Sequence, residues 1–334
     1  MLPPRIDMVF TYVDGAEPAY AARRAALRQA LGLAASERAS WSRGAGEITY
    51  AVRSVLRAMP WIGTIHIVTD GQTPPVDADL MRAGRVRLVD HGAIIPERYR
   101  PVYASTIIES CLHRIPGLSD VWLYNNDDFL HGAALTPDDF LAPAADGGLR
   151  LRVRTVPALV RVAIAALSRA APPGLPRANP YTAGIANAAW LLRRAGLSWR
   201  DIVFPRHVTQ VYRSSTARWL EETFAAELDA ARSRHFRGPG QLSWSTLAYS
   251  AECHRQQALP IRWRPLAGPA DAAFIDFDRY RSPAQLAAAW RRVSGCEAKF
   301  ICINNIPEAE APRLAAAMAA RGLGGAAGGD RLPP

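Results

Sequence analysis

The chain has 334 residues, of which 49% are hydrophobic and 21% are charged; this composition excludes a disordered chain and allows one large domain or a domain with an insertion. Its formal net charge is +10, and Lys299 is its only lysine, so arginine carries almost all of the positive charge. Arginine pairs well with phosphate, so an anionic partner and a simple solvated surface are both compatible with this charge. No basic run with interleaved aromatic residues is present, and we expect no nucleic-acid partner.

The cysteines and the apolar runs indicate the cellular compartment in which the protein is expected. The four cysteines form no CxxC pair, so we expect small buried residues in a reducing compartment and neither a zinc site nor a redox motif. The first 15 residues carry Asp7 and Asp14, which does not fit a signal peptide. No apolar run reaches the ~18 residues that cross a bilayer. We therefore expect a cytoplasmic protein and leave open a peripheral contact with the inner face of the membrane.

The first 130 residues alternate between short apolar strands and helical patterns. The expected strands are Ile6–Val13, Thr64–Thr69, Val86–Val89 and Val121–Asn125, and the expected helices are Pro18–Leu33, Glu47–Met59 and Ser105–His113. This alternation predicts an α/β fold with an open, mainly parallel, Rossmann-like sheet. We place the boundary of this α/β core at residues 1–145.

Beyond residue 145 the sequence predicts a mostly helical insertion and C-terminal part. Residues 149–180 are rich in Arg, Ala and Pro and show no clear period, apart from a short helix at Pro157–Ser168. The later expected elements are a helix at Ser215–Arg234, a helix from Pro283 to Gly295, a strand at Lys299–Ile303 and an Ala-rich helix after Pro307. We therefore divide the remainder into a variable insertion at 146–200, a C-terminal part at 201–322 and a disordered tail at 323–334.

Three of the expected strands are followed by turns that contain aspartate. The dipeptides Asp14-Gly15 and Asp70-Gly71 follow directly on the first two, and the pair Asp127-Asp128 follows the last after Asn126. Ligands of open α/β sheets bind beyond the carboxyl ends of the strands, so we expect these residues along one edge. Adjacent carboxylates suit Mg²⁺ or Mn²⁺, which prefer oxygen ligands. The structural alternative is a turn at each position.

Further polar residues are candidates for chemistry, each with a structural alternative. His207 is either a base or phosphate ligand, or a structural histidine. Arg237 precedes a Gly/Pro turn and either binds phosphate or lies solvated at the surface, and Arg53 offers the same choice. Asn304 and Asn305 are metal or hydroxyl ligands, or N-caps of the helix that follows them. Together these signals indicate a metal-and-phosphate site, but they define no reaction.

Four blocks of the sequence have the character of motifs. The first, Ile6–Gly15, reads IDMVFTYVDG; the second runs from Glu47 to Asp128 and contains LHRIPGLS followed by NDD. The third is looser and surrounds His207 and His235–Arg237, and the fourth, Lys299–Asn305, reads KFICINN. In this order the blocks resemble the Stealth family. Its members include bacterial capsular-polysaccharide phosphotransferases and the animal enzyme that puts GlcNAc-1-phosphate on lysosomal glycoproteins.

The resemblance implies a reaction and its partners. A nucleotide-sugar such as UDP-GlcNAc would donate hexose-1-phosphate to a glycan hydroxyl in capsular or exopolysaccharide synthesis, and the acceptor could be lipid-linked. The hydroxyl attacks the phosphorus next to the sugar, UMP leaves, and the C1–O bond of the donor stays intact. The α/β core would bind the nucleotide-sugar, and the C-terminal part would complete the catalytic site.

The resemblance also implies roles for the candidate residues. Asp127 and Asp128 would hold Mg²⁺ or Mn²⁺, with help from Asn304 or Asn305. Arg237 would bind phosphate oxygens, and His207 would be the base on the acceptor side, with Asp14 as the alternative. The pocket for the nucleotide-sugar is expected to be lined by Gly15, Arg53, Asp70, Gly71 and Asn126.

Two positions depart from the family pattern. Asn305 stands where the family usually has Asp, and Gln241 stands near a position at which many members carry an acidic residue. Two alternatives to the phosphotransferase therefore remain open. One is a metal-dependent, GT-A-like glycosyltransferase, which would release UDP in place of UMP. The other is a catalytically weakened protein that binds a nucleotide-sugar without turnover.

Overall fold

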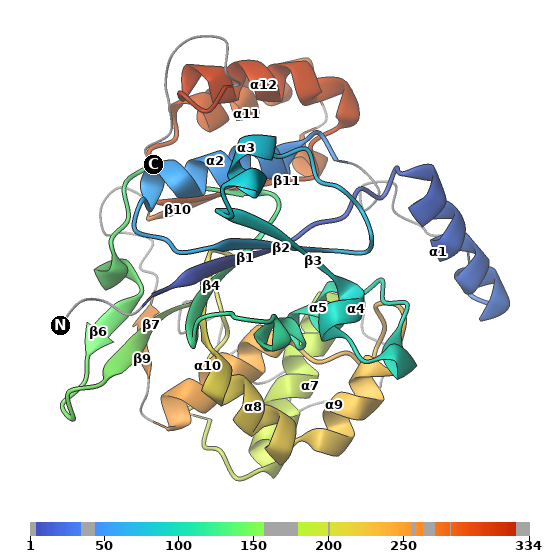
Figure 1. The fold of residues 1–334 in the computed structure, drawn as a ribbon, viewed down its shortest axis with the longest axis vertical. Helices are drawn as coiled ribbons and strands as arrows, with labels where there is room; N and C mark the ends of the chain where they lie inside the picture. The colour runs from blue at the N-terminus through green and yellow to red at the C-terminus, as the bar shows by residue number, and fades with distance from the viewer. Residues whose placement is uncertain are drawn as a thin grey trace. The chain divides into compact units, whose positions relative to one another are not determined.

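The computed structural model describes residues 5–34, 44–156, 180–199, 201–255, 258–262, 271–280 and 282–324. The strands (Figure 1) are β1 (Asp7–Thr11), β2 (Ile65–Thr69), β3 (Val86–Asp90), β4 (Val121–Asn126), β5 (Phe129–Leu130), β6 (Leu141–Pro143), β7 (Leu149–Thr155), β8 (Gln210–Arg213), β9 (Ala258–Arg262), β10 (Ala272–Asp276) and β11 (Phe300–Asn304). The α-helices are α1 (Pro18–Ala30), α2 (Glu47–Ala58), α3 (Ala78–Arg82), α4 (His91–Ile94), α5 (Ser105–Glu109), α7 (Pro180–Arg194), α8 (Ser214–Thr223), α9 (Ala225–Arg232), α10 (Trp244–His254), α11 (Pro283–Gly295) and α12 (Ala311–Ala320). Short 3₁₀ helices are η2 (Glu97–Tyr99), η3 (Leu112–Arg114), η4 (Pro137–Asp139), η5 (Phe277–Arg279) and η6 (Glu308–Glu310).

The largest sheet confirms the predicted α/β fold. Its strand order is β3-β2-β1-β4-β8, it is mainly parallel, and β8 runs antiparallel to β4 with Val121 opposite Arg213. Every side chain of β2 is buried, as are all those of β1 except Thr11. Burial on both faces explains why these strands read as continuous apolar runs, since parallel strands are covered on both sides.

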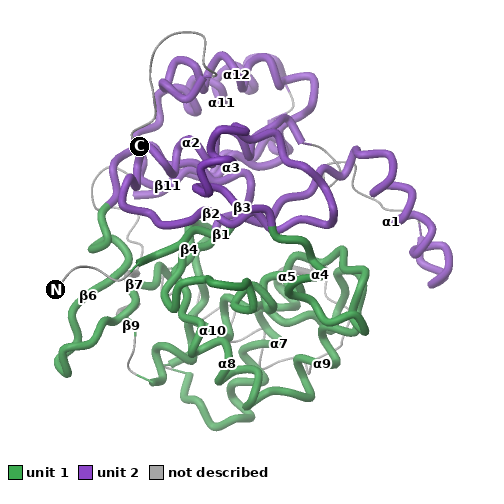
Figure 2. The backbone as a smooth tube through the Cα atoms, in the orientation of Figure 1, with its two compact units in different colours: residues 1–9, 89–124, 136–267 green, residues 10–88, 125–135, 268–334 purple. Residues whose placement is uncertain are grey.

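The chain divides into two compact units, and neither is continuous in sequence (Figure 2). Unit 1 consists of residues 1–9, 89–124 and 136–267, and unit 2 consists of residues 10–88, 125–135 and 268–334. The strands β1, β3 and β4 contribute residues to both units. The predicted boundaries at residues 145, 200 and 322 stay predictions.

Unit 1 contains a helical cluster and a three-stranded sheet. Helix α10 packs against α5, α7 and α8, and its Trp244 and Tyr249 are buried. The sheet has the order β6-β7-β9, with β7 antiparallel to β6 and parallel to β9. The sequence predicted no regular structure at the start of residues 149–180. This prediction is wrong for Leu149–Thr155, because these residues form β7. The predicted helix Pro157–Ser168 lies outside the described residues.

Two predicted helices of unit 1 are interrupted. The expected helix Ser215–Arg234 is two helices, α8 and α9, because Phe224 has φ −121° and ψ 36° and buries its ring beside Trp219. The expected helix Ser105–His113 ends at Glu109 and resumes as η3. There the guanidinium of Arg232 donates to the carbonyl oxygen of Ser110 (2.6 Å) and so satisfies a carbonyl group at the helix end.

Unit 2 holds the elements that carry most of the candidate residues. Helix α2 and its C-cap residue Met59 bury the apolar stripe predicted from the spacing (Ile48, Val52, Val55, Leu56 and Met59), and α2 packs against β5. The strands β10, β11 and β5 form a second three-stranded sheet, in which β10 and β11 are parallel. Helix α11 begins at Pro283, as predicted, and packs side by side with α12 (Figure 1). Its N-cap Ser282 forms a capping box with Gln285.

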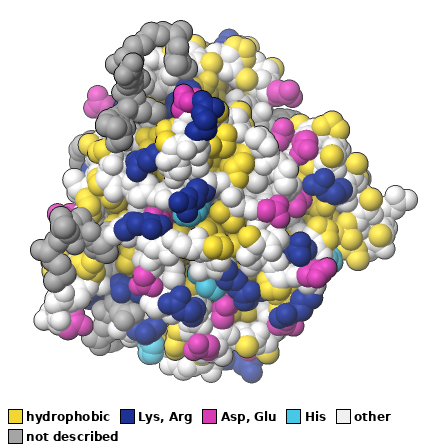
Figure 3. All heavy atoms as spheres, in the orientation of Figure 1, with side chains coloured by type: hydrophobic (Ala, Val, Ile, Leu, Met, Phe, Trp, Pro, Cys, Tyr) yellow, Lys and Arg dark blue, Asp and Glu magenta, His cyan; other side chains and the backbone are white. Residues whose placement is uncertain are grey.

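The surface mixes charges of both signs. On the face drawn in Figure 3, Lys and Arg side chains stand in small groups with Asp and Glu between them. None of the helices in the described ranges is both long enough and apolar enough to cross a membrane.

Candidate functional site

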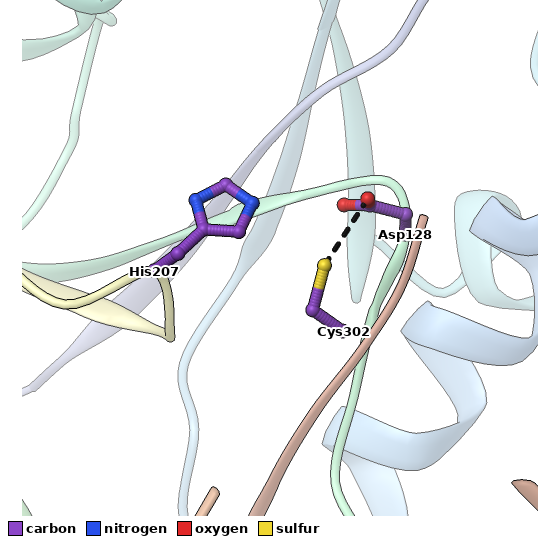
Figure 4. Close-up of side chains that lie close together, drawn as sticks. All are labelled: Asp128, His207 and Cys302. Atoms are coloured by element: carbon purple, nitrogen blue, oxygen red, sulfur yellow. Dashed lines mark hydrogen bonds between the residues drawn. The ribbon is translucent and has the colours of Figure 1, made fainter. Parts of the chain in front are cut away.

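The turn Asp127-Asp128 joins β4 to β5 in unit 2, and its backbone is fixed by β11. Phe129 lies opposite Cys302 in the antiparallel pair, and the N–H of Ile303 donates to the carbonyl oxygen of Asp128 (3.0 Å). The thiol of Cys302 donates to Oδ2 of Asp128 (3.3 Å), as the dashed line of Figure 4 shows. Oδ1 of Asp128 is buried and has no hydrogen-bond partner in the described part of the chain. One oxygen atom of this carboxylate is thus fixed, and the other is available to a ligand.

Three carboxyl groups of unit 2 share an unfavourable environment for negative charge. Burial, then Asp128 and Glu47, raise the pKa of Asp127 well above its ordinary value. Burial raises the pKa of Asp128 to about 7, and burial also raises the pKa of Glu47. A divalent cation would stabilise the ionised forms, since Mg²⁺ and Mn²⁺ take carboxylate oxygens as ligands. The donor set and the unpartnered oxygen of Asp128 therefore fit the predicted Mg²⁺ or Mn²⁺.

Glu47 is a site residue that sequence reasoning missed. It lies in the first turn of α2, where an acidic residue is expected for its favourable interaction with the helix dipole. Its place in the helix therefore suggested no further role, although the charge of Glu47 also raises the pKa of Asp127. The only available signal was its place at the start of the second sequence block.

The pKa of Tyr12 responds both to Asp14 and to the carboxylates described above. Burial, followed by the charges of Asp14, Asp127 and two glutamates, raises the pKa of Tyr12 to about 12. Oδ1 of Asp14 accepts the N–H of Ala16 (2.9 Å), so Asp14 also forms the turn that was its structural alternative. The Gln72 side chain accepts from the N–H of Asp14 (2.9 Å) and donates to its carbonyl oxygen (2.8 Å), which ties the loops after β1 and β2 together.

The residues predicted to line the nucleotide-sugar pocket have different surroundings. Arg53 makes a bidentate ion pair with Asp77 (3.0 and 3.2 Å) and donates to the carbonyl oxygen of Leu323 (3.1 Å). Asp70 pairs with Arg23 (3.2 Å). Three more lie at strand ends and turns: Gly15 is buried, Gly71 has φ 69°, and Asn126 is half-buried at the end of β4. Their role in donor binding stays a prediction.

Asn304 and Asn305 lie at the carboxyl end of β11. Asn304 is two residues beyond Cys302, and it therefore shares the strand face that carries the thiol bound to Asp128. Asn305 has φ 59° and donates from Nδ2 to Oδ1 of Asp276 (3.0 Å). The alternative of a helix cap is wrong for both residues, since Pro307 is the N-cap of η6 and Glu310 that of α12.

Arg237 lies in unit 1 on a segment that is fixed against the start of α5. Its guanidinium donates to Oγ of Ser105 (2.9 Å). The neighbouring Phe236 stacks on Tyr103 with ring centroids 5.1 Å apart. Burial raises the pKa of Glu109 to about 7, and the charge of Arg237 opposes that rise. Glu109 is a second carboxyl group that sequence reasoning missed as a site residue, although it lies within the second sequence block.

His207 belongs to the loop before β8 in unit 1 and is drawn together with Asp128 and Cys302 in Figure 4. His207 is exposed at the surface. Neighbouring residues nevertheless remove part of the hydration of its imidazole, and this desolvation lowers the pKa of His207 to about 4. The imidazole is consequently neutral at pH 7 and can accept a proton. Gln241, also in unit 1, is buried, and its side chain lies close to Gly184.

Comparison with known proteins agrees with the resemblance seen in the sequence. Residues 42–147 match the family model of Stealth protein CR2, conserved region 2. An exopolysaccharide phosphotransferase of Nocardia farcinica is 32% identical over 305 residues, which are 90% of this chain and 55% of that protein. The exopolysaccharide phosphotransferase CpsY of Mycobacterium tuberculosis is 31% identical over 316 residues, which are 93% of this chain and 54% of that protein.

The chain belongs to the Stealth family. It spans about half the length of the curated Stealth relatives that it matches. Four of the carboxyl groups described above, those of Glu47, Glu109, Asp127 and Asp128, fall within the second conserved region of the family. Among solved structures, the bifunctional glycosyltransferase WbbM covers 95% of this Stealth chain and is matched over 50% of its own length, with 11% identity and a TM-score of 0.42. A likeness of that size gives no support to any particular activity.

Proposed function

We propose that this chain transfers sugar-1-phosphate from a nucleotide-sugar to a glycan hydroxyl in the synthesis of a capsular or exopolysaccharide. The observation that carries the proposal is the carboxylate group of Glu47, Asp127 and Asp128, together with the unpartnered oxygen of Asp128. Family relatives that are named exopolysaccharide phosphotransferases support the reaction class. The donor in this proposal is UDP-GlcNAc or a related nucleotide-sugar.

The reaction exchanges one phosphorus–oxygen bond for another. The acceptor hydroxyl oxygen forms a bond to the phosphorus next to the sugar, and the bond from that phosphorus to the bridging oxygen of UMP breaks. Neutral His207 takes the hydroxyl proton, and UMP leaves with the electron pair of the broken bond. Asp14 is the alternative base. The guanidinium of Arg237 binds phosphate oxygens, where it stabilises the charge of the transition state.

The carboxylates of unit 2 act on the donor side in this proposal. Asp127 and Asp128 would hold a divalent cation, with Asn304 or Asn305 contributing an amide oxygen and Glu47 contributing negative charge. A cation bound there would neutralise the pyrophosphate of the donor. Arg53, Asp70, Gly71, Gly15 and Asn126 are proposed to line the pocket for the nucleotide and sugar.

The decisive measurement identifies the released nucleotide. Purified protein is incubated with UDP-GlcNAc, Mn²⁺ or Mg²⁺ and a panel of short glycans, and chromatography separates UMP from UDP. We expect UMP, formed in step with a sugar-phosphodiester product and abolished by EDTA. Asp128→Asn should lower the rate by about 100-fold or more, the usual loss on removing one group that stabilises transition-state charge.

The matched control for this variant is Asp79→Asn on α3, because the side chain of Asp79 is 87% exposed and pairs with Arg82 of its own helix. It should release UMP at the wild-type rate. Release of UDP would replace the proposal with a glycosyltransferase. Donor binding without release of either nucleotide, over the full acceptor panel, would replace it with a binding protein.

A further inference from the structure

The carboxyl ends of two parallel strands in unit 2 carry a paired carboxylate and amide. Asp276 is the last residue of β10 and lies opposite Asn304 in the parallel pair with β11. Asn305 follows β11 and donates from Nδ2 to Oδ1 of Asp276 at 3.0 Å. We refer to Asp276 and Asn305 as the amide–carboxylate pair.

The orientation of the Asn305 amide follows from the chemistry of its partner. An ionised carboxylate only accepts hydrogen bonds, so the amide must direct its NH₂ group, and not its oxygen, toward Asp276. Oδ1 of Asn305 is therefore turned away from Asp276 and is not used by this pair. The backbone adds to the constraint, because Asn305 is the one non-glycine residue in the described ranges with a positive φ (59°), a region that asparagine tolerates better than most residues.

Asp276 is itself held in place by two other groups. Its Oδ1 also accepts the N–H of Asp278 at the start of η5 (3.2 Å), and its Oδ2 pairs with Nε of Arg279 (3.2 Å). Its side chain is only 16% exposed. With both oxygens engaged, this carboxylate is well suited to fix a neighbouring residue, whereas it has little capacity left to bind a ligand itself.

The pair lies at the same sheet edge as the Asp127-Asp128 turn. Strand β5 runs antiparallel to β11, so the residue that precedes β5 stands at the carboxyl end of β11, and that residue is Asp128. The N–H of Ile303 reaches the carbonyl oxygen of Asp128 at this edge (3.0 Å).

We propose that Asp276 is a positioning residue that holds Asn305 so that its amide oxygen serves the cation site of Asp127 and Asp128. This inference rests on the proposed function for the identity of that site. It also accounts for Asn at position 305. A carboxylate there would lie about 3 Å from that of Asp276, and like charges so close cannot both stay ionised without a large cost. The amide–carboxylate pair therefore has its carboxylate, Asp276, on β10 and its amide, Asn305, on the loop after β11.

The test is a double-mutant cycle with Asp276→Asn, Asn305→Asp and the exchanged variant that carries both substitutions. Two quantities are measured for each protein: Mn²⁺ affinity, from the electron paramagnetic resonance signal of free Mn²⁺, and thermal unfolding in EDTA. Asp278→Asn is the control, because Asp278 contributes only its backbone N–H to Asp276. Neither quantity requires an active enzyme.

Asp276→Asn should weaken Mn²⁺ binding by roughly 10-fold or more, the usual effect of losing a residue that orients a metal ligand. Asn305→Asp should lower the unfolding temperature at pH 8 more than at pH 4, because two carboxylates then meet. The exchanged variant restores one donor and one acceptor, and it should recover both the unfolding temperature and the Mn²⁺ affinity. Asp278→Asn should change neither.

Two outcomes would overturn the inference. If stability recovers in the exchanged variant while Mn²⁺ affinity is the same in all four proteins, the pair is only structural. If Asn305→Asp by itself binds Mn²⁺ as well as the wild type and unfolds at the same temperature, the two side chains do not interact. Failure of the proposed function is a separate result, namely no UMP from the wild type, and it leaves the Mn²⁺ measurements interpretable.

Discussion

Asp128 has two oxygen atoms in unlike surroundings, one bound by the thiol of Cys302 and one buried without a partner. Its pKa of about 7 lies far above the ordinary value for aspartate, so in the absence of a cation its ionisation opposes folding. A carboxyl group with a raised folded-state pKa contributes stability below the unfolded-state pKa, near 4, and loses it as the pH rises through about 7.

Replacing this carboxyl group should therefore stabilise the protein without metal. We predict that Asp128→Asn raises the unfolding temperature in EDTA by about 2–4 °C at pH 8, the shift that ~1 kcal/mol gives a domain of 150–250 residues. The gain should be much smaller near pH 4, where the carboxyl is protonated in the folded state and about half protonated in the unfolded state. Calorimetry at the two pH values checks this, with Asp79→Asn as the exposed control. An equal gain at both pH values would mean that packing, and not charge, is responsible.

Glu109 and Arg237 provide a second prediction for single residues. Arg237 opposes the rise in the pKa of Glu109, so Arg237→Gln should move the ionisation of Glu109 to a pH above about 7. A titration followed by ¹³C resonances of glutamate, with the signal assigned through Glu109→Gln, measures the midpoint directly. Arg218→Gln on α8 is the control, since the side chain of Arg218 is 59% exposed and its ionic partner is Asp120. An unmoved midpoint would show that Arg237 does not act on Glu109.

At the scale of elements, an ion-pair network joins η3 to helices α8 and α9 in unit 1. Glu221 accepts from His113 (3.0 Å) and Arg114 (2.9 Å) and pairs with the buried Arg232 (2.5 Å). The same guanidinium holds Ser110, the residue after Glu109. The network therefore supports the segment that carries Glu109.

Glu221→Gln should weaken this support in a pH-dependent way. The bonds from His113 and the charges of the arginines outweigh burial and lower the pKa of Glu221 to about 2. Its stabilising effect is then present above the unfolded-state pKa, near 4.5, and is lost as the pH falls toward 2. We expect Glu221→Gln to cost about 3 kcal/mol at pH 7, since Arg232 loses its charged partner. Urea unfolding at pH 7 and pH 3 checks this, and the difference between variant and wild type should shrink at pH 3. The exposed neighbour Glu222→Gln should cost little at either pH.

The elements that could be predicted from sequence are those with a local signal. The apolar runs predicted β1, β2 and β4, and Pro283 at the expected helix start predicted α11. Helix α10 was missed because Trp244 and the seven consecutive residues Thr246–Glu252 are all buried, and a helix buried on all sides has no amphipathic period. Glu47 and Glu109 were missed because burial raises the pKa of both carboxyl groups, and burial depends on the tertiary packing, which has no local signal in the sequence.

At the scale of the whole molecule, cation binding should be visible as stability. A ligand that binds only the folded state stabilises it by about 2.7 kcal/mol when present at 100 times its dissociation constant. We predict that Mn²⁺ raises the unfolding temperature of the wild type, that EDTA reverses the shift, and that Asp128→Asn abolishes it. Differential scanning calorimetry over a series of Mn²⁺ concentrations measures the effect. A shift of equal size in Asp128→Asn would place the bound cation elsewhere.

The pairing of β5 with β11 has a consequence for how the chain is made. Leu130 lies opposite Ile301, so the sheet that positions Asp128 joins residues from the first half of the chain to residues near its end. The ribosome must synthesise β11 before this sheet can form. Until then the turn Asp127-Asp128 of the emerging chain is not supported by β11. Formation of the sheet requires closure of a long loop, which slows folding. A protein cut before residue 268 would lack β10, β11 and both asparagines, and the acidic turn alone could not be transplanted as an independent module.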